Sequence, residues 1–279
     1  MAGIDRWLGS APAVLVGNPT AHSGKAERLI RRARALLDAA GVAHRFMPTR
    51  PDGETVGMVT EAVASGSRVI IYLGGDGTFA EVAKGILASP HAPSVTMGML
   101  PTGTANDQGK SFGLGAGWRA LDHNIGVIAH GATVELDVGQ VEVETDGVRH
   151  RDLFFDSFSI GIAAAALAVR NRDRERVGRI PLLSRVYRDQ AVYAGALVKS
   201  LLKSYVVDVK FSASVVVDGV VHQFDSVLDL IIKNTRIFGG EWVLEPDTEY
   251  DDGKLELIPI IGRRDLTTRV FAGFRHSPI

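Results

Sequence analysis

A glycine-rich run follows the apolar residues 69–73 and precedes a helical pattern; it consists of Gly74, Gly75, Asp76, Gly77 and Thr78. Free backbone N–H groups and the helix dipole favour phosphate binding at such a junction. The glycines let the backbone approach a ligand, Asp76 would face a metal ion, a ribose or a substrate hydroxyl, and Thr78 can cap the helix. A plain capped turn is the alternative, but three glycines around one acid favour a phosphate site.

A second polar turn follows the next apolar run and has the sequence Leu100-Pro101-Thr102-Gly103-Thr104-Ala105-Asn106-Asp107. Turns that follow neighbouring parallel strands lie at the same carboxyl edge of a sheet, where open α/β sheets bind ligands. The alternative is a loop in which Asn106 or Asp107 caps a short helix. We expect the two turns to form one binding edge.

A third turn, residues 18–25, offers N–H donors at the start of another predicted helix. It lacks the full G-x-x-x-x-G-K-[ST] spacing, which excludes a classical P-loop. The eight histidines show no spacing typical of a metal site, and His22 is interpreted as a solvated loop residue rather than a phosphate contact.

The elements that position these turns alternate up to about residue 130. Apolar runs at 13–16, 43–47, 69–73 and 95–100 predict strands, and apolar residues at helical spacing predict helices between them. Val82, Ile86 and Leu87 are expected to face inward from the helix that starts at Thr78. A later helix is predicted to contain Trp118, Leu121, Ile125 and Ile128. The pattern predicts an α/β N-terminal domain with a parallel sheet, residues 1–132.

From residue 133 the pattern changes to longer alternating strands. Asp146-Gly147 and Asp218-Gly219 separate such strands, and Asp-Gly pairs are strong hairpin signals. A helical segment is predicted over residues 181–204. The region 133–279 is therefore predicted to be a mostly antiparallel, β-sandwich-like domain.

Composition excludes several classes of protein. The 279 residues suffice for two modest domains, the net charge is −1, and cysteine is absent, so there is no global attraction to nucleic acid and no thiolate chemistry. The apolar, uncharged stretch of residues 157–169 is too short to span a bilayer, which needs roughly 17 to 25 residues. No signal peptide is recognisable. We expect a cytoplasmic protein.

A basic segment, residues 170–203, contains nine lysine and arginine residues and three acidic residues. An anionic membrane would attract such a segment. A solvated helix face is the alternative, and the charges alone do not decide between them.

Taken together, the motifs resemble the diacylglycerol kinase catalytic-domain superfamily, which also holds sphingosine kinases, bacterial lipid kinases and, more distantly, NAD kinases. The resemblance covers nearly the whole chain. Besides the three turns, with the glycine run continuing to Glu81-Val82, its motifs are Asp137-Val138-Gly139, Ser159-Ile160-Gly161, Phe238-Gly239-Gly240, Pro246 and Asp252-Gly253. NAD kinases share the first glycine loop but not the second, so the lipid branch is favoured.

The resemblance implies an ATP site between two domains and a Mg²⁺ site at Asp252, completed by backbone carbonyls near Glu249 and Lys254. On sequence alone, Asp251-Asp252-Gly253 is interpreted first as a hairpin turn. The candidate nucleotide-binding residues are Asn18, Thr49, Gly74, Gly75, Asp76, Gly77, Thr78, Phe79, Ala80, Glu81, Gly103, Thr104, Asn106 and Asp107.

The chain departs from the family pattern at two places. Ala80 stands where the family usually has Asn, and no Asp-Gly-Glu motif, whose glutamate is taken as the general base in many bacterial members, precedes Ile279. We therefore expect either a fragment that lacks the C-terminal end of its second domain or a chain in which Asp76 is the catalytic base.

The sequence thus predicts an ATP- and Mg²⁺-dependent kinase that acts on diacylglycerol or a related lipid. Peripheral contact with the inner membrane surface follows from a lipid substrate, no nucleic-acid partner is expected, and a homodimer is left open. The alternatives are a NAD kinase-like enzyme and a nucleotide-binding regulatory module.

Overall fold

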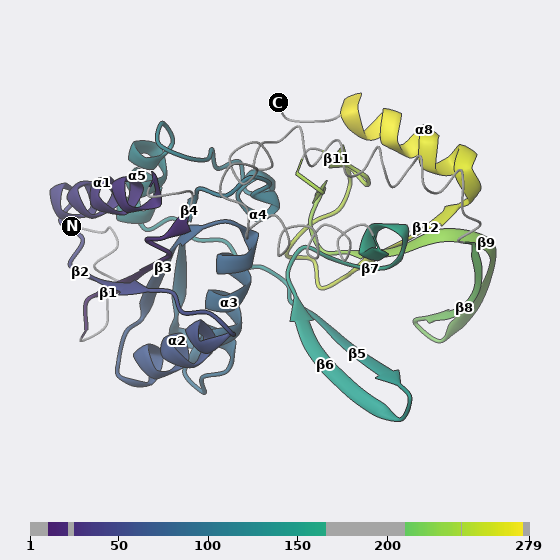
Figure 1. The fold of residues 1–279 in the computed structure, drawn as a ribbon, viewed down its shortest axis with the longest axis horizontal. Coiled ribbons are helices and arrows are strands. Elements are labelled where there is room, and N and C mark those ends of the chain that lie inside the picture. The colour runs from purple at the N-terminus through teal and green to yellow at the C-terminus, as the bar shows by residue number, and fades with distance from the viewer. Residues whose placement is uncertain (1–10, 22–24, 166–209, 241, 276–279) are drawn as a thin grey trace, which may run out of the picture. The chain divides into compact units, whose positions relative to one another are not determined.

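The structure is a computed structural model that describes residues 11–21, 25–165, 210–240 and 242–275. It divides into two compact units, Met1–Glu135 and Leu136–Ile279 (Figure 1). The first contains a parallel sheet and the second antiparallel sheets, which confirms the predicted fold class. The predicted helical segment 181–204 and the basic segment 170–203 lie outside the described residues.

The N-terminal unit is built on a four-stranded parallel sheet with the strand order β2-β1-β3-β4. Its strands are β1 (Ala13–Gly17), β2 (His44–Pro48), β3 (Val69–Gly74) and β4 (Thr96–Pro101). The central strands β1 and β3 are almost wholly buried. Strands covered on both faces have continuous apolar runs rather than alternating ones, which is why these two could be found in the sequence.

Helices cover both faces of this sheet. They are α1 (Lys25–Ala39), α2 (Glu54–Ala64), α3 (Asp76–Leu87), the short turn η3 (Ala92–Ser94), α4 (Asp107–Ser111) and α5 (Leu121–His130). The pair α1 and α5 packs on one face and the pair α2 and α3 on the other (Figure 1). Because the four strands are parallel, their carboxyl ends all lie at one edge of the sheet, and the glycine turns follow there.

Two helix predictions need correction. Leu87 was predicted to face inward, but its side chain is 41% exposed because α3 ends there. Trp118 was placed inside a helix, whereas α5 begins only at Leu121. Trp118 instead lies in the preceding loop, 49% exposed, with the guanidinium of Arg32 4.5 Å from its ring centroid.

The C-terminal unit is centred on the long strand β9. Its strands are β5 (Gly139–Thr145), β6 (Val148–Phe154), β7 (Ser157–Gly161), β8 (Phe211–Val217), β9 (Val220–Lys233), β10 (Ile237–Phe238), β11 (Trp242–Val243) and β12 (Glu256–Ile261). Strand β9 pairs antiparallel with β7, β8 and β12. Helix α8 (Gly262–Arg275) packs against β9, β11 and β12 through the buried Leu266.

Both predicted Asp-Gly hairpins are confirmed. Asp146 and Gly147 join β5 to β6, and Asp218 and Gly219 join β8 to β9, all four with positive φ. A two-residue turn of this type matches the right-handed twist of the strands. The third predicted hairpin turn, Asp251-Asp252-Gly253, is wrong: these residues form a bend before β12, which pairs with β9.

Among the residues that the structure describes, no helix combines the length and the apolar composition needed to cross a bilayer.

Candidate functional site

The first glycine loop forms the junction between β3 and α3. Strand β3 ends at Gly74, and α3 begins at Asp76 with Gly75 as an extended N-cap residue that offers no side-chain cap. Thr78, the predicted cap, lies inside the first turn of the helix. A Cβ at Gly74 would come within 2.5 Å of its Oγ1 atom. The helix therefore begins on glycine backbone, and no side chain caps its first N–H groups.

The second glycine loop is folded on itself by Asn106. This residue is the N-cap of α4 in the left-handed conformation, with φ 53°, and it makes no side-chain cap. Its side-chain oxygen instead accepts a hydrogen bond from the Gly103 N–H (2.8 Å), and its amide donates to the Gly103 carbonyl (2.7 Å). Asn106 thus occupies the N-cap position of a short helix, as the alternative expected, but its side chain closes the loop instead of capping the helix. Asp107 is the first helical residue and is almost fully buried.

Asp76 joins the two loops. One carboxylate oxygen accepts a hydrogen bond from the Asn106 N–H (2.9 Å), and the other accepts a longer one from the Gln108 N–H (3.4 Å). The backbones also meet, because a Cβ at Gly103 would lie only 2.4 Å from the Gly75 Cα. The two loops that the sequence predicted to share an edge are thus brought together in one unit.

The other two strands contribute smaller turns at this edge. The Asn18 side-chain oxygen accepts hydrogen bonds from the N–H (2.9 Å) and hydroxyl (2.8 Å) of Thr20, which closes a turn after β1. The Thr49 N–H donates to the Gly17 carbonyl (3.0 Å), which places Thr49 beside the end of β1. His22 and the rest of the third turn up to residue 24 lie outside the described residues.

The residues that follow the first loop differ in their access to a ligand. Phe79 is 4% exposed and packs edge-on against Tyr72, with ring centroids 5.4 Å apart. Burial, assisted by the charge of Asp76, raises the pKa of the Tyr72 hydroxyl far above its usual range. Phe79 can therefore offer a nucleotide only its backbone. Ala80 and Glu81 are half-buried, as are Gly74, Thr78 and Thr104, whereas Gly77 is exposed.

The candidate metal loop lies in the C-terminal unit. The Asp252 carboxylate accepts a hydrogen bond from the Lys254 N–H (3.0 Å) and lies 3.3 Å from the Lys254 ammonium group. Asp137, which the sequence did not single out as a site residue, accepts a hydrogen bond from the Gly253 N–H (2.6 Å) and donates its own N–H to the Tyr250 carbonyl (2.7 Å). Two carboxylates thus converge on the bend 250–253.

The carboxylate oxygens of Asp252 and Asp137 are of a chemical type that can bind Mg²⁺. Mg²⁺ prefers oxygen ligands and is usually bound by one or two carboxylates together with substrate phosphates and water. Within the described residues no group of three or more His, Cys, Asp or Glu side chains could hold a metal ion. The bend offers two carboxylates, Asp252 and Asp137, of the ligand type that Mg²⁺ prefers, while Glu249 is exposed.

Asn234 supports the Asp137 segment from within the unit. Its buried side-chain amide donates to the carbonyls of Asp137 (2.6 Å) and Phe155 (3.0 Å). The neighbouring Lys233 is fully buried, and its ammonium group contacts the Ile237 carbonyl (2.5 Å) and the Asp156 carboxylate (3.4 Å). Sequence reasoning missed Gln108, Asp137 and Asn234 as site residues. Only Asp137 gave a signal, as part of a family motif.

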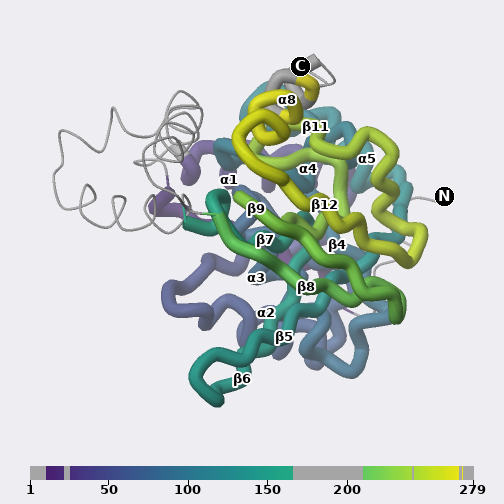
Figure 2. The backbone as a smooth tube through the Cα atoms, turned by 90° about the vertical axis from the view of Figure 1, so that its right-hand side faces the viewer, coloured from purple at the N-terminus to yellow at the C-terminus, as the bar shows by residue number. Residues whose placement is uncertain are grey.

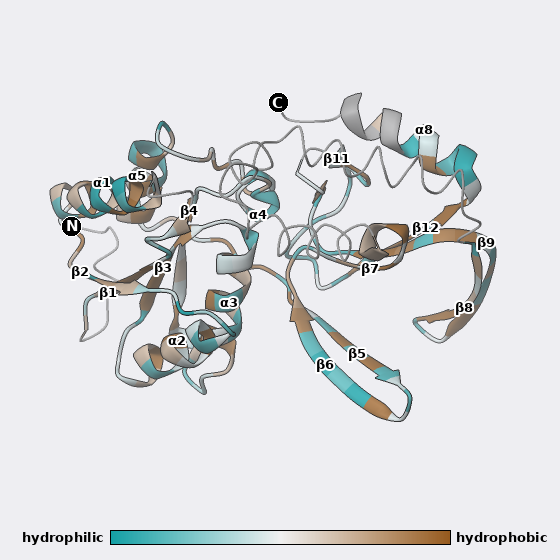
Figure 3. Cartoon of the chain, viewed as in Figure 1, coloured by the Kyte–Doolittle hydropathy of each residue, from teal (hydrophilic) through white to brown (hydrophobic). Residues whose placement is uncertain are grey.

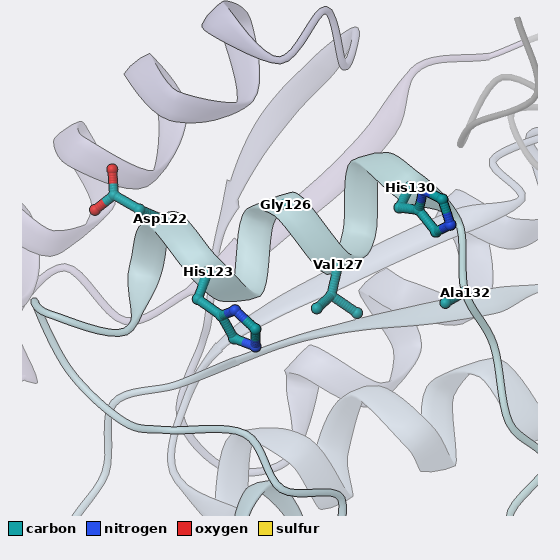
Figure 4. Close-up of a pocket in the computed structure, with 6 residues that line it drawn as sticks. All are labelled: Asp122, His123, Gly126, Val127, His130 and Ala132. Atoms are coloured by element: carbon teal, nitrogen blue, oxygen red, sulfur yellow. The ribbon is translucent and has the colours of Figure 1, made fainter.

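A separate depression lies on the surface of α5. It is lined by Asp122, His123, Gly126, Val127, His130 and Ala132 (Figure 4). The depression is open and contains none of the predicted site residues. The Asp122 carboxylate is paired with Arg32. Because the depression contains no predicted site residue, it is not part of the glycine-loop site.

Comparison with known proteins gives consistent matches. Residues 12–141 match the family model of the diacylglycerol kinase catalytic domain. The "Probable lipid kinase YegS-like" of Yersinia enterocolitica is 27% identical over 256 residues, covering 90% of this chain and 77% of that protein. A diacylglycerol kinase of Staphylococcus epidermidis is 31% identical over 129 residues, covering 46% of this chain and 39% of that protein.

The fold has solved counterparts. The crystal structure of a diacylglycerol kinase from Bacillus anthracis superposes with a TM-score of 0.64 at 20% identity, covering 94% of this chain and 77% of that chain. At this identity the likeness supports the fold alone. The residues matched by the family model include β1 to β4 and both glycine loops.

Proposed function

Because the chain belongs to the diacylglycerol kinase catalytic-domain superfamily, we propose that it is an ATP-dependent lipid kinase. It transfers the γ-phosphate of ATP to a hydroxyl group of diacylglycerol or a related lipid. Family membership supports the coarser statement, a phosphotransferase. The nucleotide, the metal and the lipid are parts of the proposal.

The observation that carries the proposal is the connection between the two glycine loops through Asp76. Phosphoryl transfer depends mainly on positioning and on electrostatic stabilisation of the transferred group. A helix N-terminus that follows a glycine turn presents backbone N–H groups to phosphate oxygens. The hydrogen bonds from Asn106 and Gln108 to Asp76 hold the second loop beside that helix start, so the edge is organised before a nucleotide arrives.

In the proposed reaction, the lipid hydroxyl oxygen attacks the γ-phosphorus of ATP. A P–O bond to the lipid forms, the bond to the bridging oxygen breaks with its electron pair, and ADP leaves. The hydroxyl proton passes to a base, for which Asp76 is the candidate in the described residues of this edge. Mg²⁺ would neutralise phosphate charge, and Asp252 and Asp137, with the carbonyls of residues 249 and 254, would hold it.

Peripheral membrane contact is part of the proposal, because a diacylglycerol stays in its bilayer. The basic segment 170–203 supports this contact by its charge. This segment lies outside the described residues.

The proposal is tested by supplying γ-labelled ATP with Mg²⁺ to the chain in three parallel reactions. One contains phospholipid vesicles with diacylglycerol, one contains NAD, and one contains vesicles without diacylglycerol. The proposal expects label in the lipid phosphate of the first reaction alone. Label transferred to NAD instead would favour the NAD kinase-like alternative. Calorimetric binding of ATP without transfer to either acceptor would favour the regulatory module.

A further inference from the structure

A stretch of polar residues, 233–236, lies at the end of strand β9. Figure 2 shows β9 running beside β7 and β12. Lys233 is the last residue of the strand, and Asn234, Thr235 and Arg236 follow it. Lys233 and Asn234 are 0% exposed and Thr235 is 1% exposed. Buried polar side chains are normally hydrogen-bonded, so their partners show which segments this stretch holds in place.

The two neighbours Asn234 and Thr235 hold different parts of the unit. The Thr235 hydroxyl donates to the Asp156 carboxylate (2.6 Å), directly before β7. The Asn234 amide instead donates to the main-chain carbonyls of Asp137 (2.6 Å) and Phe155 (3.0 Å). Asn234 therefore connects the end of β9 with the segment that precedes β5.

The carbonyl of Phe155 lies in an apolar part of the unit. Strand β6 is hydrophilic along its middle and apolar at Leu153 and Phe154 (Figure 3), and the Phe155 side chain is 5% exposed. A buried carbonyl that loses its donor cannot turn to water instead, so the loss is costly. The amide of Asn234 thus fixes the Asp137 and Phe155 segments relative to each other.

Asp137 extends this connection to the bend 250–253. Its N–H donates to the Tyr250 carbonyl (2.7 Å), and its carboxylate accepts a hydrogen bond from the Gly253 N–H (2.6 Å). Because Asn234 binds its carbonyl, Asp137 is held at three points. The position of the bend therefore depends on a residue that does not contact it.

Arg236 holds the loop that leads into the bend. Its guanidinium donates to the carbonyl of Thr248 (2.8 Å), two residues before Tyr250. The residues that follow β9 thus hold the bend from two sides, through Arg236 at Thr248 and through Asn234 at Asp137.

We propose that Asn234 is a positioning residue for the metal site at this bend. The inference rests on the proposed function, in which Asp252 and Asp137 hold Mg²⁺. Asn234 is fully buried and both hydrogen bonds of its NH2 group go to carbonyls, so it acts through Asp137 and not as a ligand. Mg²⁺ demands near-ideal ligand geometry. A displaced Asp137 therefore weakens metal binding although both carboxylates are retained.

A pair of neighbouring substitutions separates positioning from a purely structural role. Asn234→Leu keeps the approximate size of the side chain and removes the two donors, and Thr235→Val does the same for the hydroxyl that binds Asp156. Each leaves a carbonyl or carboxylate without a donor, so each should lower the Tm. Only Asn234→Leu should raise the half-saturating Tb³⁺ concentration at the bend, by about 10- to 100-fold. Tyr250 sensitises the emission, and the concentration dependence, not the intensity, is compared.

Equal weakening of Tb³⁺ binding by both variants would reduce Asn234 to a structural residue. No weakening by Asn234→Leu would overturn its positioning role directly. If Asn234→Leu does not fold, Asn234→Ala replaces it in the comparison. Alanine leaves room for a water molecule to bridge the two carbonyls, and a smaller effect in the same direction is expected.

Hydrogen exchange tests the same connection without a metal ion. In the metal-free chain, Asn234→Leu should speed exchange of the Asp137 and Gly253 N–H groups by about tenfold, relative to the amides of β12. These two groups form the hydrogen bonds between Asp137 and the bend. Thr235→Val should leave their relative exchange as in the wild type. Unchanged exchange in Asn234→Leu would show that the bend does not depend on Asn234.

These measurements also separate the inference from the proposed reaction. Changes in Tb³⁺ affinity and exchange that are confined to Asn234→Leu would support the positioning role even if no lipid were phosphorylated. A wild type that bound Tb³⁺ no better than Asp252→Asn would overturn the metal site and the positioning role together. Wild-type binding that depends on Asp252 but not on Asn234 would overturn the positioning role alone.

Discussion

Two acidic residues, one in each unit, are held in opposite ways. Both carboxylate oxygens of Asp76 accept hydrogen bonds from backbone N–H groups of the second glycine loop. Asp229, on β9, is 3% exposed; its Oδ2 accepts a hydrogen bond from the Ala163 N–H (2.7 Å), and its Oδ1 is buried without a hydrogen bond in the described structure. The difference separates a carboxylate that organises a site from one whose burial makes it sensitive to pH.

The largest expected effect is on Asp76. Asp76→Asn replaces one acceptor oxygen with an NH2 group. The substitution removes the proposed base, and it also places a hydrogen-bond donor against a backbone N–H donor of the second loop. Loss of a general base typically lowers the rate about 10²- to 10⁴-fold, and we expect kcat for lipid phosphorylation to fall in that range with weaker ATP binding. Radiometric transfer and calorimetry measure the two effects.

Two variants make this result specific. Asp38→Asn changes an exposed carboxylate, 74% exposed, on the same unit, and it should leave transfer unchanged. Asp229→Asn should also leave the rate at neutral pH within a few fold. If Asp229→Asn reduced transfer as much as Asp76→Asn, the contrast between an organising and a titrating carboxylate would be broken.

Asp252 should have the next largest effect, since its carboxylate is a proposed metal ligand in a partly exposed bend. Asp252→Asn should raise the Mg²⁺ concentration for half-maximal activity by about 10- to 100-fold. A Tb³⁺ titration, with emission sensitised by the nearby Tyr250, reports binding without turnover. Asp251→Asn changes the exposed neighbour and should behave as wild type. Equal Tb³⁺ affinity in both variants would argue against Asp252 as a ligand.

The contact between the two loops predicts a smaller effect on stability. In Gly103→Ala the new methyl group would meet the Gly75 backbone at 2.4 Å, so the loops must separate. We expect the free energy of unfolding to fall by about 1–3 kcal/mol and ATP affinity to fall with it, measured by urea denaturation and calorimetry.

Gly126→Ala is the matched control for the loop variant. Gly126 lies in α5, is exposed, and has no heavy atom within 4 Å of a built Cβ. Alanine there should stabilise the helix by up to about 1 kcal/mol. If Gly103→Ala also left stability and ATP affinity unchanged, the close approach of the loops would not matter for the site.

The comparison also shows what sequence can predict. The glycine loops could be located because they follow buried apolar strands, and the hairpins because Asp-Gly pairs suit positive φ. The hydrogen-bond partners of Asp76 could not be predicted from the sequence. Asn106 and Gln108 lie 30 and 32 positions away along the chain, and only the fold brings them near Asp76.

Gly161 shows the same limit in the second unit. The sequence placed Gly161 in a family motif. Glycine is needed at this position because the backbone packs closely against Leu228 and Asp229. With φ at 138°, a Cβ there would meet the Leu228 carbonyl at 2.4 Å and the Asp229 Oδ1 at 3.1 Å. Such packing depends on strand register between β7 and β9, which a composition pattern does not specify.

The smallest predicted effect concerns the pH dependence of stability at Asp229. Burial raises its pKa from 3.8 to about 6, while the N–H groups of Ala163 and Leu230 oppose the rise. Because the pKa in the folded state is above that in the unfolded state, the contribution to stability is fully present below about pH 3.8 and is lost as the pH rises through 6. Relative to Asp229→Asn, the wild type should therefore gain about 1 kcal/mol between pH 7 and pH 5.

Urea denaturation of both chains at several pH values measures this difference, because groups common to both chains cancel. Asp225→Asn, at an exposed position of the same strand, should show no such gain. A wild type whose stability relative to Asp229→Asn stayed constant from pH 7 to pH 5 would mean that the unbonded Oδ1 is solvated in solution. Asp229 would then resemble Asp76 in having both oxygens satisfied, and the distinction between the two carboxylates would rest on their positions in the fold rather than on their protonation.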